Sequence, residues 1–309
     1  MSTSELTKKG TGRPEEIEAV PVRRPGRWIA AVIVLVIAAS LIRAVITAKG
    51  FQWGVVGDYL FDSRILHGVL RTILLTFLSM AIGIALGIVL ATMRQSPNPL
   101  VSGSSWLYIW FFRGTPLLVQ LLFWYNLASL FQVLSIGVPF GGPALIHGST
   151  NSIVTTFVAA LLGLGLNEGA YMAEIVRAGF LSVPEGQTEA AQSLGMSRLQ
   201  IMRLVVLPQA MRVIVPPTGN ETISMLKNTS LASAITYVEL LYSAQEIYSA
   251  NFKTIPLLIV VSIWYLVMTS VLYVGQYFVE RHYGRGFTRA QQVTMRSRWL
   301  GSRGNPAVP

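Results

Sequence analysis

The chain has 309 residues, of which 52% are hydrophobic and only 12% are charged, and its formal net charge is +10. Soluble domains carry about twice that charged fraction, so the apolar side chains must face lipid rather than water. The basic residues lie at the ends of apolar segments and in the two tails, which argues against a nucleic-acid surface. The sequence has no cysteine, which excludes disulfides, thiolate metal sites and cysteine nucleophiles. Three scattered histidines (His67, His147 and His282) give no metal constellation.

The first 64 residues contain a polar tail and one apolar run. Residues 1–27 are polar and include three prolines, so we expect a disordered cytoplasmic tail. The apolar run that follows, from Trp28 to about Ala48, is long enough to cross a bilayer as a helix. It is too long for the apolar part of a signal peptide. We therefore predict that residues 28–64 form an accessory membrane helix and an outer loop.

A second span is predicted for residues 65–93. Within it, Gly83, Gly87 and Ala91 recur at every fourth position, which places three small residues on one helix face. Such a face favours the close approach of another helix. The alternative is that these are ordinary small residues of a glycine-rich membrane helix.

The next apolar run, residues 106–134, is interrupted by Arg113-Gly-Thr-Pro116. Because proline lacks an N–H, we expect a short helix, a break, and then a span that starts at about Leu117. Residues 135–150 are rich in glycine and proline and predict an outer loop.

The remaining apolar runs predict three more spans, at residues 152–177, from about 209 onward, and at 256–279. Pro216 and Pro217 lie inside the second of these, which should therefore be kinked or broken. Residues 238–255 are more polar and are expected to lie along the outer face.

Six spans place both termini on the same side of the membrane. Residues 1–27 carry six lysines and arginines and residues 281–309 carry six arginines, whereas the outer loops hold only Lys49, Arg64 and Lys253. Because basic residues are retained in the cytoplasm, both tails are expected there. The predicted fold class is an all-α integral membrane protein with about six transmembrane helices. A five-helix core, residues 65–280, follows the accessory helix.

A polar segment, residues 182–208, separates the fourth and fifth spans. The S-x-x-E run that begins at Ser182 and the S-x-x-Q run that begins at Ser197 both match the capping box, so two short helices are expected. Gly195 lies between them, where a left-handed residue ends a helix at low cost. Pro208 marks the predicted end of the second helix. Such a helix–turn–helix is suited to docking into a groove on a partner.

Within this segment, Glu189-Ala190-Ala191 is followed by Gly195 and then by Val205-x-Leu207-Pro208. The arrangement resembles the EAA loop of ABC-importer permeases. Three flanking runs resemble the polar amino acid branch of these permeases, the histidine/glutamine permease type: residues 171–177, 113–116 and 227–231. The resemblance covers roughly residues 65–280.

The resemblance implies a permease subunit of an ABC importer that moves a polar amino acid across the inner or plasma membrane of a bacterium into the cytoplasm. It also implies two ATPase subunits, an extracytoplasmic amino-acid-binding protein, and a second permease, identical or closely related. In that scheme the ATPase-coupling residues are Glu189, Ala190, Ala191, Gly195, Leu207 and Pro208. The chain lacks a G-x-x-x-x-G-K-[ST] phosphate loop, so ATP and magnesium are expected on the separate ATPase. This subunit is then expected to be no enzyme and to hold no metal or cofactor.

Charged residues inside the predicted spans are candidates for a substrate path, because charges are costly in a bilayer. Glu168 lies one helical turn from Tyr171, and a carboxylate beside a phenol suits a substrate ammonium. A structural role beside an internal cation is the alternative for Glu168. Glu174 and Arg177 are expected to pair with each other.

The fifth span supplies further candidates for this path. Glu221 and Lys227 are charges inside the span, and the family resemblance places the span against the translocation path. The candidate substrate-path residues here are Asn220, Lys227, Thr229 and Ser230. Ordinary interhelical hydrogen bonds are the alternative for these side chains.

Two other classes of protein are alternatives. A self-sufficient secondary amino acid carrier would also contain internal charges and a broken helix, but it would have no use for residues 182–208. An intramembrane enzyme would need a His/Asp/Cys or Ser/Lys constellation, which the chain lacks at a sensible spacing. If Glu168 binds the substrate, a cationic amino acid such as arginine, lysine or histidine is favoured over glutamine or glutamate.

Overall fold

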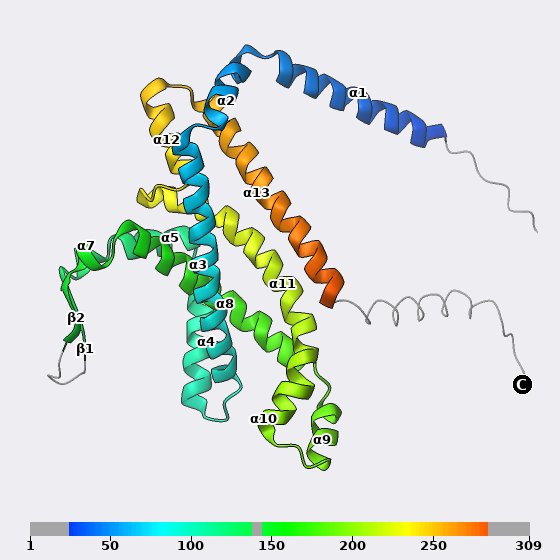
Figure 1. Cartoon of the computed structure of the whole chain (residues 1–309), viewed down its shortest axis with the longest axis vertical. Helices are drawn as coiled ribbons and strands as arrows, with labels where there is room; N and C mark the ends of the chain where they lie inside the picture. The colour runs from blue at the N-terminus through cyan, green and yellow to red at the C-terminus, as the bar shows by residue number, and fades with distance from the viewer. Residues whose placement is uncertain (1–24, 138–143, 284–309) are drawn as a thin grey trace, which may run out of the picture. The chain divides into compact units, whose positions relative to one another are not determined.

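The computed structural model describes residues 25–137 and 144–283 and divides the chain into two units, residues 1–51 and 52–309 (Figure 1). The first unit contains α1 (Pro25–Thr47) and a 3₁₀ turn, η1 (Lys49–Phe51). Residues 29–47 of α1 are long and apolar enough to cross a membrane, as predicted. The predictions for the far N-terminal tail and for the basic C-terminal tail beyond residue 283 lie outside the described residues.

The second unit is almost entirely helical. Its elements in chain order are α2 (Trp53–Leu60), α3 (Ser63–Arg94), α4 (Pro99–Gly114), α5 (Leu117–Tyr125), α6 (Leu127–Leu130), β1 (Val133–Gly137), β2 (Ala144–Ser149), α7 (Thr150–Ile153), α8 (Thr156–Leu181), α9 (Glu185–Ser193), α10 (Arg198–Ile201), the π-helical turn η2 (Met202–Val206), α11 (Leu207–Asn228), the 3₁₀ helix η3 (Thr229–Ile235), α12 (Leu240–Asn251) and α13 (Thr254–Tyr283).

The structure confirms an all-α membrane fold. Across the described residues, four helical stretches are long and apolar enough to cross a membrane, and five if the bent pair α4–α5 counts as one. The fourth predicted span, residues 152–177, corresponds to α8, which has 26 residues but carries Asn167, Glu168 and Glu174. The two structural units separate the accessory helix α1 from the rest of the chain.

The core of the second unit is built around the close packing of α3 on α8, which confirms the predicted small-residue face. A Cβ added at Gly87 would lie 2.5 Å from the Cβ of Met172. The relation is reciprocal, since a Cβ at Gly169 on α8 would lie 2.7 Å from Leu86 on α3. Glycines on both helices therefore let the two backbones approach, as in other membrane helix pairs.

The break at Arg113–Pro116 is confirmed, but the expected lengths are wrong. The helix before the break, α4, has 16 residues, whereas α5 after it has only nine, and their axes differ by 101°. The chain then turns again through α6 instead of continuing as one span from Leu117 to Leu134.

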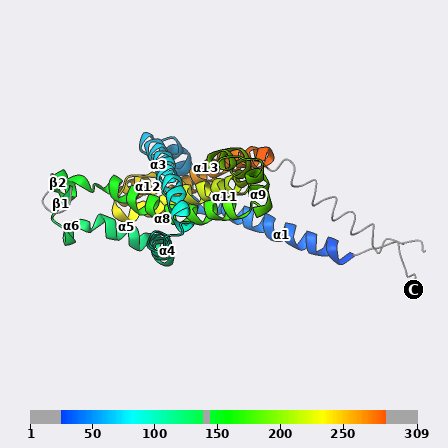
Figure 2. The same cartoon turned by 90° about the horizontal axis from the view of Figure 1, so that it is seen from below.

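Both predicted loops contain regular structure. Within residues 51–64, the helix α2 buries Val56, and Leu60 accepts a hydrogen bond from the indole of Trp264 on α13 at 2.8 Å. The segment predicted as an outer loop at residues 135–150 forms much of an antiparallel hairpin, in which Val133 pairs with Ser149. Figures 1 and 2 both show this hairpin beyond α5 and α7, away from α9 and α13.

The prolines around the fifth span do not break it, so of the predicted kink or break the structure excludes the break. Pro208 was expected to end a helix, but α10, η2 and α11 follow one another without a gap. The Leu207 N–H bonds to the Met202 carbonyl in a π turn, which widens the helix just before the proline ring. Pro216 and Pro217 lie within unbroken α11, where the Pro216 carbonyl accepts a hydrogen bond from the Gln276 amide at 2.8 Å.

Candidate functional site

The segment 182–208 folds as the predicted pair of short helices, and Gly195 makes the turn between them. Gly195 has φ of 74°, in the left-handed region. Its N–H bonds to the Gln192 carbonyl at 2.9 Å, and the Met196 N–H bonds to the Ala191 carbonyl at 3.2 Å. These two bonds form a Schellman motif, which satisfies the last carbonyls of α9.

One of the two predicted capping boxes is present. The Ser197 hydroxyl accepts from the Gln200 N–H at 3.4 Å, and the Gln200 side chain accepts from the Ser197 N–H at 2.8 Å. The box predicted at Ser182 is wrong, because α8 extends to Leu181 and the Ser182 hydroxyl donates back to the Gly179 carbonyl. The helix α9 therefore begins after Pro184 without a side-chain cap.

The outer surface of this helical pair is unusually apolar for a polar segment. Only Ala191 and Ile201 of its described apolar side chains are buried. Leu194 is 81% exposed, and Leu199 and Leu204 are about two-thirds exposed. The predictions from the sequence did not include these three leucines. Leucines isolated among polar residues were the signal that could have identified them. Exposed apolar side chains rimmed by polar ones are typical of a protein-docking surface.

The remaining coupling candidates lie on this surface or at its base. Glu189 and Ala190 are exposed on α9, and Leu207 and Pro208 are exposed at the start of α11. Figure 1 shows α9 and α10 together at the end of α8 and α11. The continuity of α10, η2 and α11 joins the surface directly to the fifth span.

A second group of functional candidates forms a charged cluster in which Glu168 is buried, Glu221 is partly buried, and Arg113 and Tyr171 are exposed. The Arg113 guanidinium, at the end of α4, lies 5.3 Å from the centre of the Tyr171 ring on α8. Arg113 also acts electrostatically on Glu221 of α11, and Glu221 in turn acts on Glu168 of α8. The structure thus brings predicted Glu168 and Tyr171 together with two residues from other helices.

Glu168 is the most unusual member of this cluster. The residue is only 4% exposed, and its Oε1 atom has no hydrogen-bond partner among the described residues. An isolated buried carboxylate oxygen is costly unless something pairs with it. The Glu168 carboxylate is therefore available in this cluster to pair with a cation.

The broken helix beside the cluster is held by two amide side chains. Because Pro116 has no N–H, the Phe112 carbonyl at the end of α4 loses its helical partner. The Asn167 amide donates to that carbonyl at 2.9 Å, and the Gln120 amide donates to it at 3.0 Å. Gln120 and Asn167 also bond to each other at 3.2 Å. This pair fixes the end of α4, and hence the position from which Arg113 extends.

The other predicted polar residues have local partners. Arg177 bonds to Glu174 at 2.6 Å, which confirms the expected pair. The Thr229 hydroxyl donates to the Leu226 carbonyl, and the Ser230 hydroxyl donates to the Lys227 carbonyl, both at 2.7 Å. Asn220 is exposed beside Glu221, and Lys227 is exposed in the last turn of α11.

A buried carboxylate that the sequence did not reveal is Glu239, at the start of α12. It is fully buried and accepts hydrogen bonds from the Leu241 N–H, the Tyr242 N–H and the Tyr265 hydroxyl at 2.8–3.0 Å. Burial raises the pKa of Glu239 to about 7, although these hydrogen bonds oppose the shift. Its role is to cap α12 and tie it to α13.

Comparison with known proteins places these features in a family. The protein family described as binding-protein-dependent transport system inner membrane component matches residues 83–285. The chain is 49% identical over 281 residues to the arginine transport system permease protein ArgU of Corynebacterium glutamicum, covering 90% of this chain and 87% of the relative. It is 40% identical over 184 residues to the nopaline transport system permease protein NocM of Agrobacterium fabrum, covering 59% of this chain and 72% of the relative.

Solved structures agree with this placement. A crystal structure of an amino acid ABC transporter with histidines is similar with a TM-score of 0.61 and 35% identity, over 72% of this chain and 95% of that chain. The inward-facing MetNI methionine ABC transporter shares the fold with a TM-score of 0.58 at 18% identity, over 72% and 97% of the two chains. The chain therefore belongs to the binding-protein-dependent transport system inner membrane components, as an ABC-importer permease of the polar amino acid branch.

Proposed function

We propose that this permease moves a cationic amino acid, with arginine as the first candidate, into the cytoplasm. The observation that carries the proposal is the buried carboxylate oxygen of Glu168 on α8, which has no hydrogen-bond partner among the described residues. Glu221 acts electrostatically on the same carboxylate. Two carboxylates in a low-dielectric site favour a ligand with two positive groups. The similarity to an arginine transport permease supports the same substrate class.

The cluster also offers a counterpart for the substrate carboxylate. The α-amino group and the cationic side chain of the substrate would face Glu168 and Glu221, and its carboxylate would face Arg113. A guanidinium is well suited to a carboxylate because it presents a fork of N–H donors. Tyr171 carries Arg113 on its ring face and so helps to orient it. The path would continue along α11 past Asn220, Lys227, Thr229 and Ser230.

The energy would come from separate ATPase subunits, which hold ATP and magnesium and dock on the segment 182–208. The exposed Leu194, Leu199 and Leu204 would enter a groove on one ATPase subunit. The coupling surface would comprise Glu189, Ala190, Ala191, Gly195, Leu207 and Pro208. Movement of α10 would pass through η2 into α11, which carries Glu221. This chain would catalyse no reaction itself.

The complete importer would contain a second permease, identical or closely related, and an extracytoplasmic binding protein that delivers the amino acid. Both termini would face the cytoplasm, because the basic residues gather in the two tails and around α9. In this orientation the helical pair α9–α10 meets the ATPase subunits, and the hairpin β1–β2 lies on the outer side.

The test is arginine uptake by the complete importer, purified with its ATPase and binding protein and reconstituted in liposomes. We expect Glu168→Gln to lower uptake at least tenfold, because the amide cannot neutralise a cation. Glu246→Gln, at an exposed glutamate on α12, is the matched control and should transport normally. Uptake at the wild-type rate by the Glu168→Gln protein would remove Glu168 from the path. Uptake by the permease alone, without an ATPase, would instead indicate a self-sufficient carrier.

A further inference from the structure

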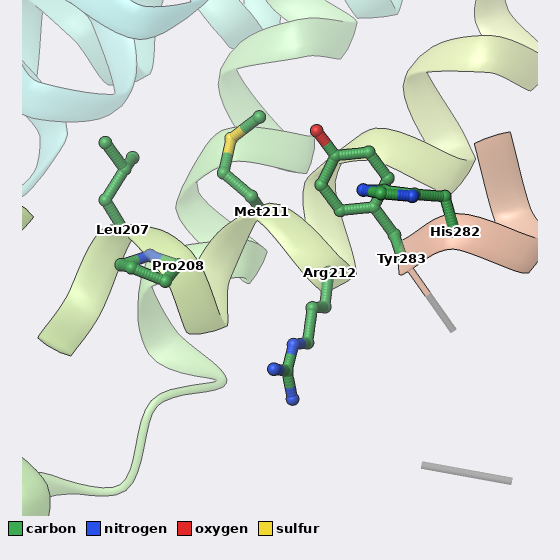
Figure 3. A pocket seen from close by; sticks show the side chains of 6 residues that line it. All are labelled: Leu207, Pro208, Met211, Arg212, His282 and Tyr283. Carbon is green, nitrogen blue, oxygen red and sulfur yellow. The ribbon is translucent and has the colours of Figure 1, made fainter. Parts of the chain in front are cut away.

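A cavity of about 400 Å³ opens between the start of α11 and the end of α13 (Figure 3). It is lined by Leu207, Pro208, Met211 and Arg212 from α11 and by His282 and Tyr283 from α13. The two helices run antiparallel here, so each contributes the end that reaches the membrane surface. With residues 182–208 in the cytoplasm, as proposed above, the cavity would lie near the boundary between lipid and water.

A fixed contact farther along the helices keeps the cavity open. The Gln276 amide donates to the Pro216 carbonyl at 2.8 Å and so sets the distance between α13 and α11. The same side chain packs on Gly219, where any Cβ would collide with it. This part-buried hydrogen bond lies about one and a half turns from the cavity and opposes any closer approach of the two helices there.

The lining of the cavity is apolar on one side and cationic on the other. Leu207, Pro208 and Met211 form the apolar part, and in Figure 3 the Arg212 guanidinium points away from Met211 and Tyr283. The His282 ring meets the Tyr283 ring edge-on at 5.2 Å. Within the described part of the chain, Arg212 has no acidic partner, and the nearby carboxylate of Glu280 accepts a hydrogen bond from Gln276 instead.

We propose that this cavity binds an anionic phospholipid. Its phosphate would meet Arg212 at the rim of the cavity, and the first methylenes of its acyl chains would lie on Met211 and Tyr283. Basic pockets between membrane helices at the bilayer surface favour anionic head groups, and arginine matches the geometry of a phosphate. The site goes beyond the transport function and is independent of which amino acid is carried. The bound lipid would contact α11, the helix that follows residues 182–208.

The experiment is native mass spectrometry of the purified permease–ATPase complex, titrated with dioleoylphosphatidylglycerol or dioleoylphosphatidylcholine in detergent. We expect selective retention of phosphatidylglycerol. Arg212→Gln should weaken it about fivefold, the effect of one basic residue at an anionic membrane surface. Met211→Trp, which fills the cavity and keeps the charge, should weaken it as well. Arg203→Gln is the matched control, since Arg203 is exposed on η2 and does not line the cavity.

Three outcomes would overturn the lipid site. These are equal retention of the two lipids, unchanged retention in Arg212→Gln, and an equal loss in Arg203→Gln, which would indicate general surface attraction. Water-soluble glycerophosphoglycerol at matched concentration should not displace the lipid, because it lacks the acyl chains; full displacement would indicate an anion site instead. The measurement uses neither substrate nor ATP, so its result is separate from that of the uptake test.

Discussion

At the scale of single residues, Gly195 shows how one backbone angle sets the turn between α9 and α10. Its φ of 74° belongs to the left-handed region, and a Cβ added there would meet no atom within 4 Å. Any cost of substitution is therefore conformational, with no steric collision. That cost is about 1–2 kcal/mol for an ordinary residue and larger for a β-branched one.

We expect Gly195→Val to abolish ATP-coupled uptake while the protein is still made and inserted. Gly195→Asn is the matched variant, because asparagine tolerates the left-handed region, and it should keep most of the activity. Uptake and ATPase rates of the reconstituted complex, normalised to the amount assembled, measure the effect. Wild-type coupling in the valine variant would show that the turn at Gly195 does not transmit motion.

At the scale of helices, the contact between α3 and α8 depends on the absence of side chains. Gly83 and Gly87 on α3 face Glu168 and Met172 on α8. The packing therefore also fixes the backbone that carries Glu168. A disturbance of this contact would reach the charged cluster directly.

Gly87→Ala should destabilise the protein by about 1–3 kcal/mol, the usual cost of overpacking, because the added methyl lies 2.5 Å from the Met172 Cβ. Gly103→Ala on α4 is the control, since a Cβ there meets nothing within 4 Å and alanine favours a helix. Thermal unfolding of both variants in the same detergent gives the comparison. Equal melting temperatures would contradict the close packing.

The limits of sequence reasoning also appear at this scale. Apolar runs predicted the positions of α1, α3, α8 and α13 within a few residues, because burial in lipid depends mainly on composition. The proline rules did not predict the unbroken helix through Pro208 and Pro216, where a π turn precedes the first ring and Gln276 on α13 donates to the Pro216 carbonyl. A rule about local sequence does not include a partner 60 residues away.

The residues of the candidate site were likewise predicted only in part. Glu168, Tyr171 and Glu189-Ala190-Ala191 stood out as charges inside a span or as a motif. Arg113 was seen only as part of a motif, since its role depends on the 101° bend between α4 and α5. Glu239 was missed because its burial arises from the packing of α3, α12 and α13.

At the scale of the whole molecule, Glu239 links stability to pH. Burial raises its pKa to about 7, so between about pH 4.5 and 7 the folded protein binds more protons than the unfolded chain. Stability from this group is therefore present at low pH and is lost as the pH rises through that window. The loss amounts to about 1–3 kcal/mol.

We expect the melting temperature of the wild-type protein to fall between pH 5.5 and pH 8 by more than that of Glu239→Gln. The glutamine is neutral throughout and so removes the titration. Glu246→Gln, at an exposed glutamate on the same helix, should keep the wild-type pH dependence. An identical pH response in wild type and Glu239→Gln would assign the effect to other groups.

The unbroken run from Arg198 to Asn228 has a consequence for evolution within the family. Successive residues of an α-helix are rotated by about 100°, so one residue gained in this run would turn every later side chain, Glu221 included, away from its present direction. The π turn at Met202–Val206 already holds one residue more than an α-helical turn requires. Length changes ahead of α11 can be absorbed there by gaining or losing that bulge, and the side chains of α11 then keep their present directions.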